Sequence, residues 1–183
     1  MRVLGIDPGS HKTGWGAVDV EGSQVRHVDN GVIFLDDDRD LTVRLVDLAH
    51  RLRDRLVELS PDVVVVEDVF VRKGARSALI LGQARGVVLA TCGMQGLTVK
   101  SVPTSQVKLR VAGRGRADKL QVAEMVRALL GLPELPFEDA ADALAVALSA
   151  VGDVGTAMAR APSPRRAKGR DALLELARAQ GKA

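Results

Sequence analysis

The sequence contains very few of the residues on which several common kinds of site depend. Its 183 residues include one cysteine, three histidines and no tyrosine. Cys92 alone can form no disulfide within the chain, and so few Cys and His residues exclude a zinc site of the usual ligand count. Any bound metal ion must therefore be held mainly by carboxylates.

Long apolar runs are also missing. Runs such as residues 63–66 are far shorter than the ~20 residues that a membrane-spanning helix needs, and the N-terminus has no signal-peptide pattern. Hydrophobic residues make up 46% of the chain, which suits one globular domain with a sizeable core. We therefore expect a soluble, cytoplasmic protein with no membrane partner.

Charge is distributed unevenly along the chain, although the net charge is only +3. Residues 72–119 hold ten basic residues and one acid, whereas residues 1–71 and 120–150 together hold nine basic residues and nineteen acids. A basic segment of this kind favours a polyanionic partner, because Lys and Arg attract phosphate and release its counterions. The alternative is an ordinary solvated surface.

The periodicity of apolar residues predicts an α/β fold. Short β-rich runs predict strands at residues 2–7, 15–20, 31–35, 62–67 and 97–102. Leucines at steps of three or four predict a helix at residues 41–59 that Pro61 ends, and further helices are expected at 75–95, from Pro103, at 118–130 and at 138–151. Together they indicate a mixed sheet with helices on both faces.

The predicted elements form one domain, residues 1–156, followed by a tail. Residues 157–183 contain two prolines and a basic run that includes Arg165, Arg166, Lys168 and Arg170. We expect this segment to be a flexible, basic C-terminal tail.

Four acids stand where packing alone does not call for them. Asp7 and Glu67 fall at the ends of apolar strands, and Asp139 and Asp142 lie three residues apart on one face of an apolar helix. Each alone could cap a turn or a helix. Together they predict an oxygen-ligand site for two Mg²⁺ or Mn²⁺ ions, suited to hydrolysis of a phosphodiester.

Several more specific motifs stand in order along the chain. They are Gly5-Ile6-Asp7-Pro8-Gly9-Ser10 with Thr13-Gly14, Glu67-Asp68-Val69-Phe70, Ser77-Ala78-Leu79 with Leu81-Gly82-Gln83-Ala84-Arg85-Gly86, Gln106-Val107-Lys108, Lys119, and Asp139-Ala140-Ala141-Asp142-Ala143-Leu144-Ala145. These motifs resemble the RuvC family of bacterial Holliday junction resolvases, within the ribonuclease H-like superfamily. The resemblance runs in order from about residue 2 to about residue 150. It implies a ribonuclease H-like, mixed five-stranded sheet with helices on both faces.

The resemblance also implies roles for individual residues. Asp7, Glu67, Asp139 and Asp142 would be the catalytic metal ligands, and Lys108 and Lys119 would contact the DNA backbone near them. Phe70 would stack on unpaired bases at the junction, within a loop made basic by Arg72, Lys73 and Arg76. The alternatives are ordinary surface lysines and, for Phe70, an ordinary core residue, which its position on a polar loop disfavours. That loop is more basic than is usual in the family, and the tail matches nothing in it.

The expected activity is therefore structure-selective, metal-dependent endonuclease cleavage. The resemblance implies paired cuts in opposing strands of a four-way DNA junction during recombination and repair, with the RuvA-RuvB branch-migration complex as a partner. Three alternatives remain: an actin-like ATPase domain, since residues 7–10 resemble its phosphate-binding hairpin, a non-catalytic junction-binding module, and a nuclease that cuts RNA hybrids.

A homodimer is the last expectation. Ala78, Gly82, Gly86 and Ala90 recur every four residues and form a ridge of small side chains on the helix predicted at residues 75–95. Such a ridge lets another helix approach closely, and Gly within a helix otherwise costs ~1 kcal/mol relative to Ala. The second helix could belong to the same subunit or to another copy. The two-fold symmetry of a junction favours a dimer, which the resemblance also implies.

Overall fold

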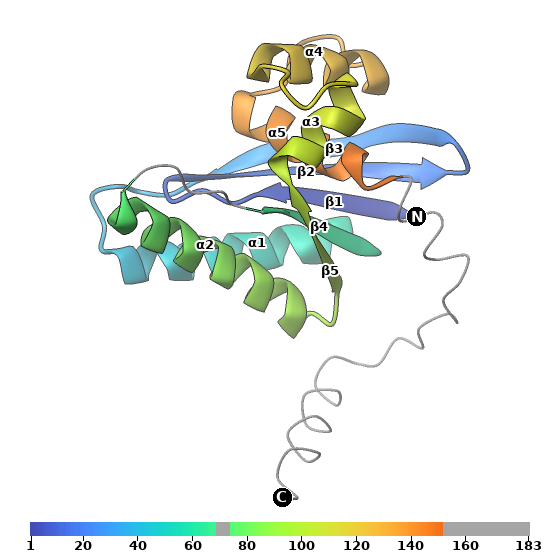
Figure 1. The fold of residues 1–183 in the computed structure, drawn as a ribbon. Coiled ribbons are helices and arrows are strands. Elements are labelled where there is room, and N and C mark those ends of the chain that lie inside the picture. Colours follow the sequence, from blue (N-terminus) through green and yellow to red (C-terminus); the bar gives the residue numbers. More distant parts are fainter. Residues whose placement is uncertain (69–73, 152–183) are drawn as a thin grey trace, which may run out of the picture.

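A computed structural model describes residues 1–68 and 74–151, and its centre is a mixed sheet of five strands (Figure 1). The strand order is β3-β2-β1-β4-β5. Strands β1 and β2 pair antiparallel, as do β2 and β3, whereas β1 pairs in parallel with β4 and β4 in parallel with β5. The strands are β1 (Arg2–Asp7), β2 (Lys12–Glu21), β3 (Gln24–Phe34), β4 (Val63–Asp68) and β5 (Thr98–Pro103). The predicted five-stranded mixed sheet is confirmed.

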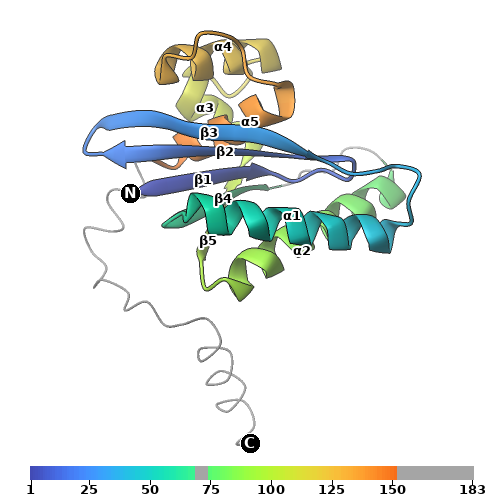
Figure 2. The ribbon, with the colours of Figure 1, turned by 180° about the vertical axis from the view of Figure 1, so that it is seen from behind.

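Helices cover both faces of the sheet, as predicted (Figure 2). One face carries α1 and α2, which pack against each other, and the other carries α3, α4 and α5. The helices are α1 (Leu41–Leu59), α2 (Ala75–Met94), α3 (Thr104–Ala112), α4 (Lys119–Leu130) and α5 (Glu138–Ser149). Asp118 caps α4 by accepting a hydrogen bond from the backbone N–H of Gln121. The helix predicted at residues 118–130 is therefore observed at residues 119–130, with Asp118 as its N-cap residue.

The central strand β4 supplies side chains to two separate cores. Val63 and Val65 pack with the helices α3, α4 and α5, whereas Val64 and Val66 pack with α1 and α2. All four side chains are buried, with exposed fractions of 5% or less. An unbroken apolar run is therefore what a strand between two helical layers requires.

The hairpin of β2 and β3 is longer than the sequence pattern predicts. A two-residue turn joins the strands at Gly22, whose φ of +60° is easily adopted by glycine. Residues 24–30, which lie between the strands predicted at residues 15–20 and 31–35, belong to β3. Because β3 is an edge strand and largely accessible to water, it tolerates polar residues that conceal the strand pattern.

Helix α5 lies unusually close to the sheet because glycines face it. A Cβ atom added to Gly5 would lie 2.1 Å from the carbonyl oxygen of Ala143, and one added to Gly14 would lie 1.9 Å from that of Asp139. Any side chain at these positions would push the helix away. Because these two positions carry no side chain, α5 can pack directly against the backbone of β1 and β2.

Helix α2 is, within the described ranges, the one helix whose length and apolar composition would suffice to cross a bilayer. Its Ala84, Val88 and Cys92 pack in the core beside α1, and Arg85 binds Asp68 of β4. The helix is thus an integral part of the α/β fold. Leu79 on its outer surface is 64% exposed.

Candidate active site

Three of the four predicted acids meet at the carboxyl ends of β1 and β4. Asp7 ends β1, and Glu67 lies near the end of β4, its parallel neighbour in the sheet. The carboxyl groups of Asp7 and Glu67 are hydrogen-bonded, and Asp142 on α5 lies close enough to repel the charge of Asp7. Strand ends and one helix therefore build an acidic site, at the edge where α/β sheets commonly bind ligands.

The electrostatics of this cluster are unfavourable without a cation. Burial, repulsion from Glu67 and the hydrogen bond with Glu67 raise the pKa of Asp7 to about 9. Burial also raises the pKa of Asp142, although Lys119 acts in the opposite direction. At neutral pH Asp7 therefore keeps its proton unless additional positive charge enters the site.

Lys119 supplies part of that positive charge. Its Nζ lies 3.2 Å from Oδ2 of Asp142 and 2.7 Å from Oε1 of Glu138, and these contacts raise the lysine pKa. The capping box formed by Asp118 and Gln121 fixes the start of α4, so Lys119 projects toward the acids from a defined position. Its side chain is 65% exposed and accessible to a substrate.

Asp139 is only partly brought into the cluster. Its backbone carbonyl lies against Gly14, which pairs with Asp7 in the sheet. Its side chain, however, is not among the groups that shift the pKa of Asp7 or Asp142. Within residues 1–68 and 74–151, no three Asp, Glu, His or Cys side chains are already arranged to hold a metal ion.

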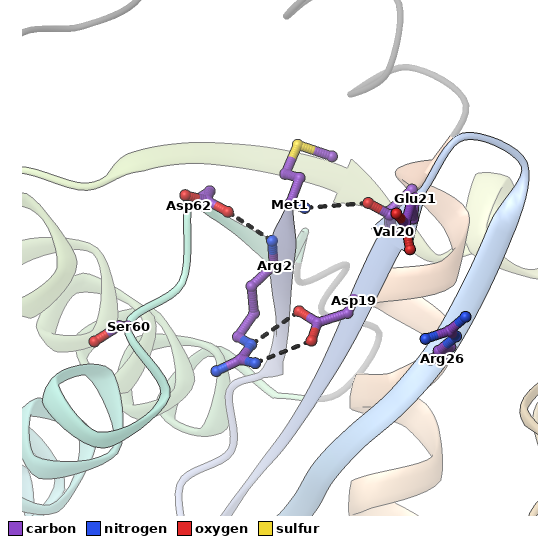
Figure 3. Close-up of a pocket in the computed structure, with 8 residues that line it drawn as sticks. All are labelled: Met1, Arg2, Asp19, Val20, Glu21, Arg26, Ser60 and Asp62. Carbon is purple, nitrogen blue, oxygen red and sulfur yellow. Dashed lines mark hydrogen bonds and ion pairs between the residues drawn. The ribbon is translucent and has the colours of Figure 1, made fainter.

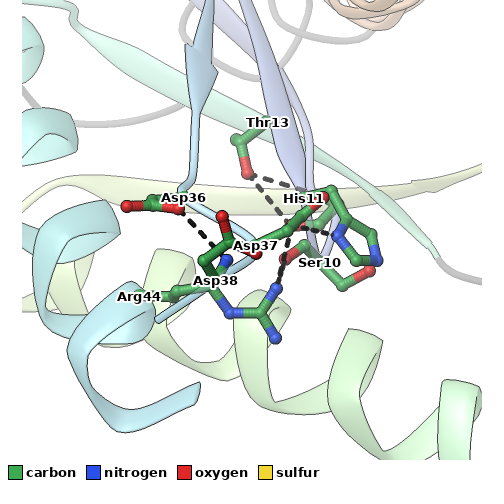
Figure 4. Close-up of polar contacts among 8 residues, drawn as sticks. Ser10, His11, Thr13, Asp36, Asp37, Asp38 and Arg44 are labelled. Carbon is green, nitrogen blue, oxygen red and sulfur yellow. Dashed lines mark hydrogen bonds and ion pairs between the residues drawn. The ribbon is translucent and has the colours of Figure 1, made fainter. Parts of the chain in front are cut away.

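A polar network holds the turn that follows Asp7 (Figure 4). Arg44 of α1 donates hydrogen bonds to the carbonyl oxygen of Ser10, at 3.4 Å, and to Oδ1 of Asp37, at 3.1 Å. His11 also binds Asp37, and the buried hydroxyl of Thr13 contacts the backbone of Gly9. The network therefore links the turn to α1 and the segment before it.

A second polar site lies at the opposite end of the same strands (Figure 3). It lines a cavity bordered by Met1, Arg2, Asp19, Ser60 and Asp62, among others. Arg2 binds both carboxylate oxygens of Asp19, each at 2.9 Å, and its backbone N–H donates to Asp62 at 2.6 Å. These charges are paired, and none of the predicted site residues is among those that line the cavity.

Comparison with known proteins assigns the family. The sequence profile described as "Crossover junction endodeoxyribonuclease RuvC" matches residues 3–150, which is most of the chain. This chain belongs to the RuvC family. The resemblance inferred from the motifs is confirmed, and so is the ribonuclease H-like fold.

Individual RuvC relatives match most of the chain. The crossover junction endodeoxyribonuclease RuvC of Citrifermentans bemidjiense is 49% identical over 148 residues, covering 81% of this chain and 90% of the relative. That of Sorangium cellulosum is 43% identical over 178 residues, covering 95% and 99% respectively. This second match extends into residues 157–183, so the expectation that the tail matches nothing in the family was wrong.

A solved structure gives the same result for the fold. Thermus thermophilus RuvC, in complex with a Holliday junction substrate, superposes with a TM-score of 0.80 at 34% identity. The match covers 86% of this chain and 96% of the Thermus chain.

The remaining predicted site residues are less closely connected to the acids. Lys108 is half-buried on α3, and Arg76 is exposed in the first turn of α2. Phe70, Arg72, Lys73 and the basic tail lie outside the described residues. Sequence analysis did not single out Glu138, Arg44 or His11. The one available signal was position in the sequence. Glu138 is next to Asp139, His11 follows the glycine turn, and Arg44 follows the acidic run before α1.

Proposed function

We propose that this chain is a metal-dependent endonuclease that resolves Holliday junctions in DNA recombination and repair, cutting opposing strands in pairs. The observation that carries the proposal is the half-buried cluster of Asp7, Glu67 and Asp142, whose negative charge exceeds what Lys119 can balance. Membership of the RuvC family supports the same activity, and a Thermus relative is known in complex with a Holliday junction substrate.

The donor set fits a hard divalent cation. Four carboxylates, those of Asp7, Glu67, Asp139 and Asp142, would hold two Mg²⁺ or Mn²⁺ ions, because oxygen ligands favour these metals. When bound, such ions activate a water molecule and stabilise the leaving oxygen of a phosphodiester. The raised pKa of Asp7 supports the assignment, because Glu67 and Asp142 repel its charge and a bound cation would offset this repulsion. Asp139 would complete the set by rotation of its side chain.

Lys119 would contact the DNA substrate as well as the acids. Without a cation it neutralises Asp142 and Glu138. With a cation bound, its ammonium group becomes available to a phosphate of the DNA backbone near the cleaved bond. Lys108 and Arg76 would add contacts to the backbone, together with Arg72 and Lys73, and Phe70 would stack on an unpaired base.

The active protein would be a cytoplasmic homodimer. The ridge of Ala78, Gly82, Gly86 and Ala90 is accessible, and a Cβ at either glycine would meet no atom of the described chain within 4 Å. Packing among residues 1–68 and 74–151 of the subunit therefore does not account for it, which favours a second copy. A two-fold dimer presents two sites to the opposing strands. By family resemblance, a RuvA-RuvB complex would be a further partner.

A cleavage assay tests the proposed function directly. The protein is incubated with a four-way DNA junction, a linear duplex of the same sequence, and an RNA-DNA hybrid, each with Mg²⁺, Mn²⁺ or chelator. We expect paired nicks in the junction alone, only with metal, and none from Asp7→Asn. Binding without metal-dependent cleavage would leave a junction-binding module, and preferential cutting of the hybrid would assign a different substrate.

The dimer has its own test. Gly82→Leu and Gly86→Leu place a large side chain on the ridge, and sedimentation measures the mass of each folded variant. We expect monomers and a loss of paired cutting on a cruciform plasmid. Unchanged dimer mass would exclude the ridge as the interface, and a wild-type protein that stays monomeric on a junction would exclude the dimer.

A further inference from the structure

Two of the three phenylalanines lie exposed and in contact with each other, at the surface beside the acidic cluster. The rings of Phe34 and Phe137 meet edge to face with centroids 5.8 Å apart, and they are 51% and 54% exposed. The ammonium group of Lys12 lies over both, 5.6 Å from the Phe34 centroid and 5.3 Å from that of Phe137. We call these three residues the aromatic patch.

The backbone positions of the patch are fixed by regular structure. Lys12 and Phe34 are direct cross-strand partners where the β2-β3 hairpin approaches the acids, and Phe137 is the N-cap residue of α5. Arg51 of α1 donates a hydrogen bond to the carbonyl oxygen of Phe34 at 3.4 Å. The rings are thus held in place, yet they contribute little to the core because about half of each stays accessible to water.

Charged side chains connect the patch to the predicted catalytic acids. Glu138 directly follows Phe137 of the patch, and it lies close enough to Lys12 for the two opposite charges to attract. Glu138 in turn binds Lys119, which binds Asp142. A DNA strand lying over this surface would therefore meet the patch and the acids in succession.

We infer that the aromatic patch binds a nucleotide of the substrate strand, with its phosphate on Lys12 and its base or sugar against the phenylalanine rings. The inference rests on the proposed function, since it adds a contact for the same DNA. An ammonium group and exposed rings together match the anionic and flat apolar parts of a nucleotide. The position beside the acids favours DNA over a protein partner, because the substrate must reach the acids across this edge.

Paired substitutions separate recognition of a nucleotide from simple packing. Phe137→Leu and Phe34→Leu keep apolar bulk but remove the aromatic face, whereas Phe137→Tyr keeps that face. We expect each Leu variant to weaken binding of a four-way junction about 10-fold or more, measured with chelator by fluorescence anisotropy, and Phe137→Tyr to bind like the wild type. Lys12→Met is expected to reduce the slope of log K against log salt by about 0.9.

Two controls make the result specific. Val57→Ala changes an exposed apolar residue of α1, on the other face of the sheet, and is expected to bind junctions normally. A thermal melt of every variant detects a purely structural clamp between the hairpin and α5. For direct contact, Phe137→Trp adds an exposed indole, expected to be quenched by bound junction, whereas the buried Trp15 of the wild type is expected to change little.

The outcomes distinguish the inference from the proposed function. Normal affinity in the folded Leu variants, or lower melting temperature with unchanged affinity, would overturn the assignment of the patch. Unquenched Phe137→Trp at saturating junction would do the same. If the wild type itself binds no junction, the proposed function fails instead. Weakened binding in the Leu variants, with normal binding in Phe137→Tyr and Val57→Ala, would support the patch.

Discussion

The two ends of β1 and β4 carry polar clusters of opposite character. At the amino ends, Arg2 pairs with Asp19 in a two-pronged contact, and this hydrogen bond lowers the pKa of the Asp19 carboxyl. At the carboxyl ends, burial and neighbouring acids raise the pKa of Asp7 to about 9. A lowered carboxyl pKa means that the fold stabilises the charge, whereas a raised one means that the fold opposes it. Only the second cluster requires an external cation, which is typical of a functional site.

The largest expected effect comes from removing charge at the carboxyl ends. Asp7→Asn, Glu67→Gln, Asp139→Asn and Asp142→Asn are each expected to lower the rate of junction cleavage by about a thousandfold or more, since bound metal supplies several kcal/mol of transition-state stabilisation. Junction binding is expected to stay largely intact, because no positive charge is lost. Single-turnover cleavage and anisotropy measure the two properties separately.

Asp19→Asn is the matched control for these variants. It removes a carboxylate from the other end of the same sheet, and its cleavage rate is expected to equal that of the wild type. Near-normal cleavage by any of the four acid variants at saturating metal would remove that residue from the site. Asp139 is the most informative of the four, because its side chain does not yet act on Asp7 or Asp142.

The next effect comes from separating α5 from the sheet. In Gly14→Ala the new Cβ would lie 1.9 Å from the carbonyl oxygen of Asp139, so the helix must move. We expect a loss of about 1–3 kcal/mol in the free energy of unfolding. A shift of the helix would also misplace Asp139 and Asp142, and cleavage is expected to fall by roughly a hundredfold.

Gly93→Ala is the control for that steric argument. Gly93 lies in α2, and a Cβ there would meet no atom of the described chain within 4 Å. Alanine is favoured over glycine within a helix, so urea denaturation is expected to show unchanged or slightly higher stability. Equal destabilisation by the two substitutions would contradict the close approach of α5 as the cause.

Local pattern predicted the parts of the site that depend on strand ends. The four valines of β4 and the short run before Asp7 identify buried strands, and parallel neighbours necessarily bring their final acids together. The same logic failed for β3, because an edge strand carries polar residues that resemble a turn. Helix α5 was predicted with Asp139 and Asp142 on one face, yet the orientation of the Asp139 side chain depends on rotamers that spacing does not determine.

Contacts between distant residues could not be predicted from the pattern. Arg44 reaches Ser10 across 34 positions, and Lys119 reaches Glu138 across 19. Each depends on how a helix is placed over the sheet, which only the packed structure determines. Phe34 and Phe137 are also distant in sequence and were unremarkable there. The resemblance to the RuvC family indicated the catalytic acids, but it did not indicate this aromatic pair.

A smaller effect concerns the stability of the metal-free protein. Between about pH 4 and pH 9 the folded state keeps a proton on Asp7 that the unfolded state has lost, so stability falls as pH rises through this range. Asp7→Asn removes this penalty. We expect its melting temperature in chelator at pH 8 to exceed that of the wild type by about 2–4 °C or more, which corresponds to about 1 kcal/mol.

The pH dependence of that difference provides the check. At pH 3, below the ordinary pKa of an aspartate, the two proteins are expected to melt at nearly the same temperature, because Asp7 is then largely protonated in both the folded and the unfolded state. Mg²⁺ or Mn²⁺ is expected to raise the melting temperature of the wild type more than that of Asp7→Asn. A variant less stable than the wild type at pH 8 in chelator would contradict the electrostatic description of the cluster.

The smallest expected effect lies at the amino ends, and it has the opposite sign. Asp19→Asn breaks the contact with Arg2, which is partly exposed, so we expect a loss of only about 0.5–1 kcal/mol in the free energy of unfolding at pH 7. Because folding lowers the Asp19 pKa, the native contact stabilises the protein above the unfolded-state pKa, and this contribution is lost as pH falls through the folded-state pKa.

Urea denaturation of the wild type and of Asp19→Asn at pH 7 and at pH 3 measures the change. The deficit of Asp19→Asn is expected to shrink toward pH 3, whereas the gain of Asp7→Asn grows toward pH 8. A deficit independent of pH would mean that Asp19 acts through packing and not through its charge, and the contrast between the two ends would then not be electrostatic.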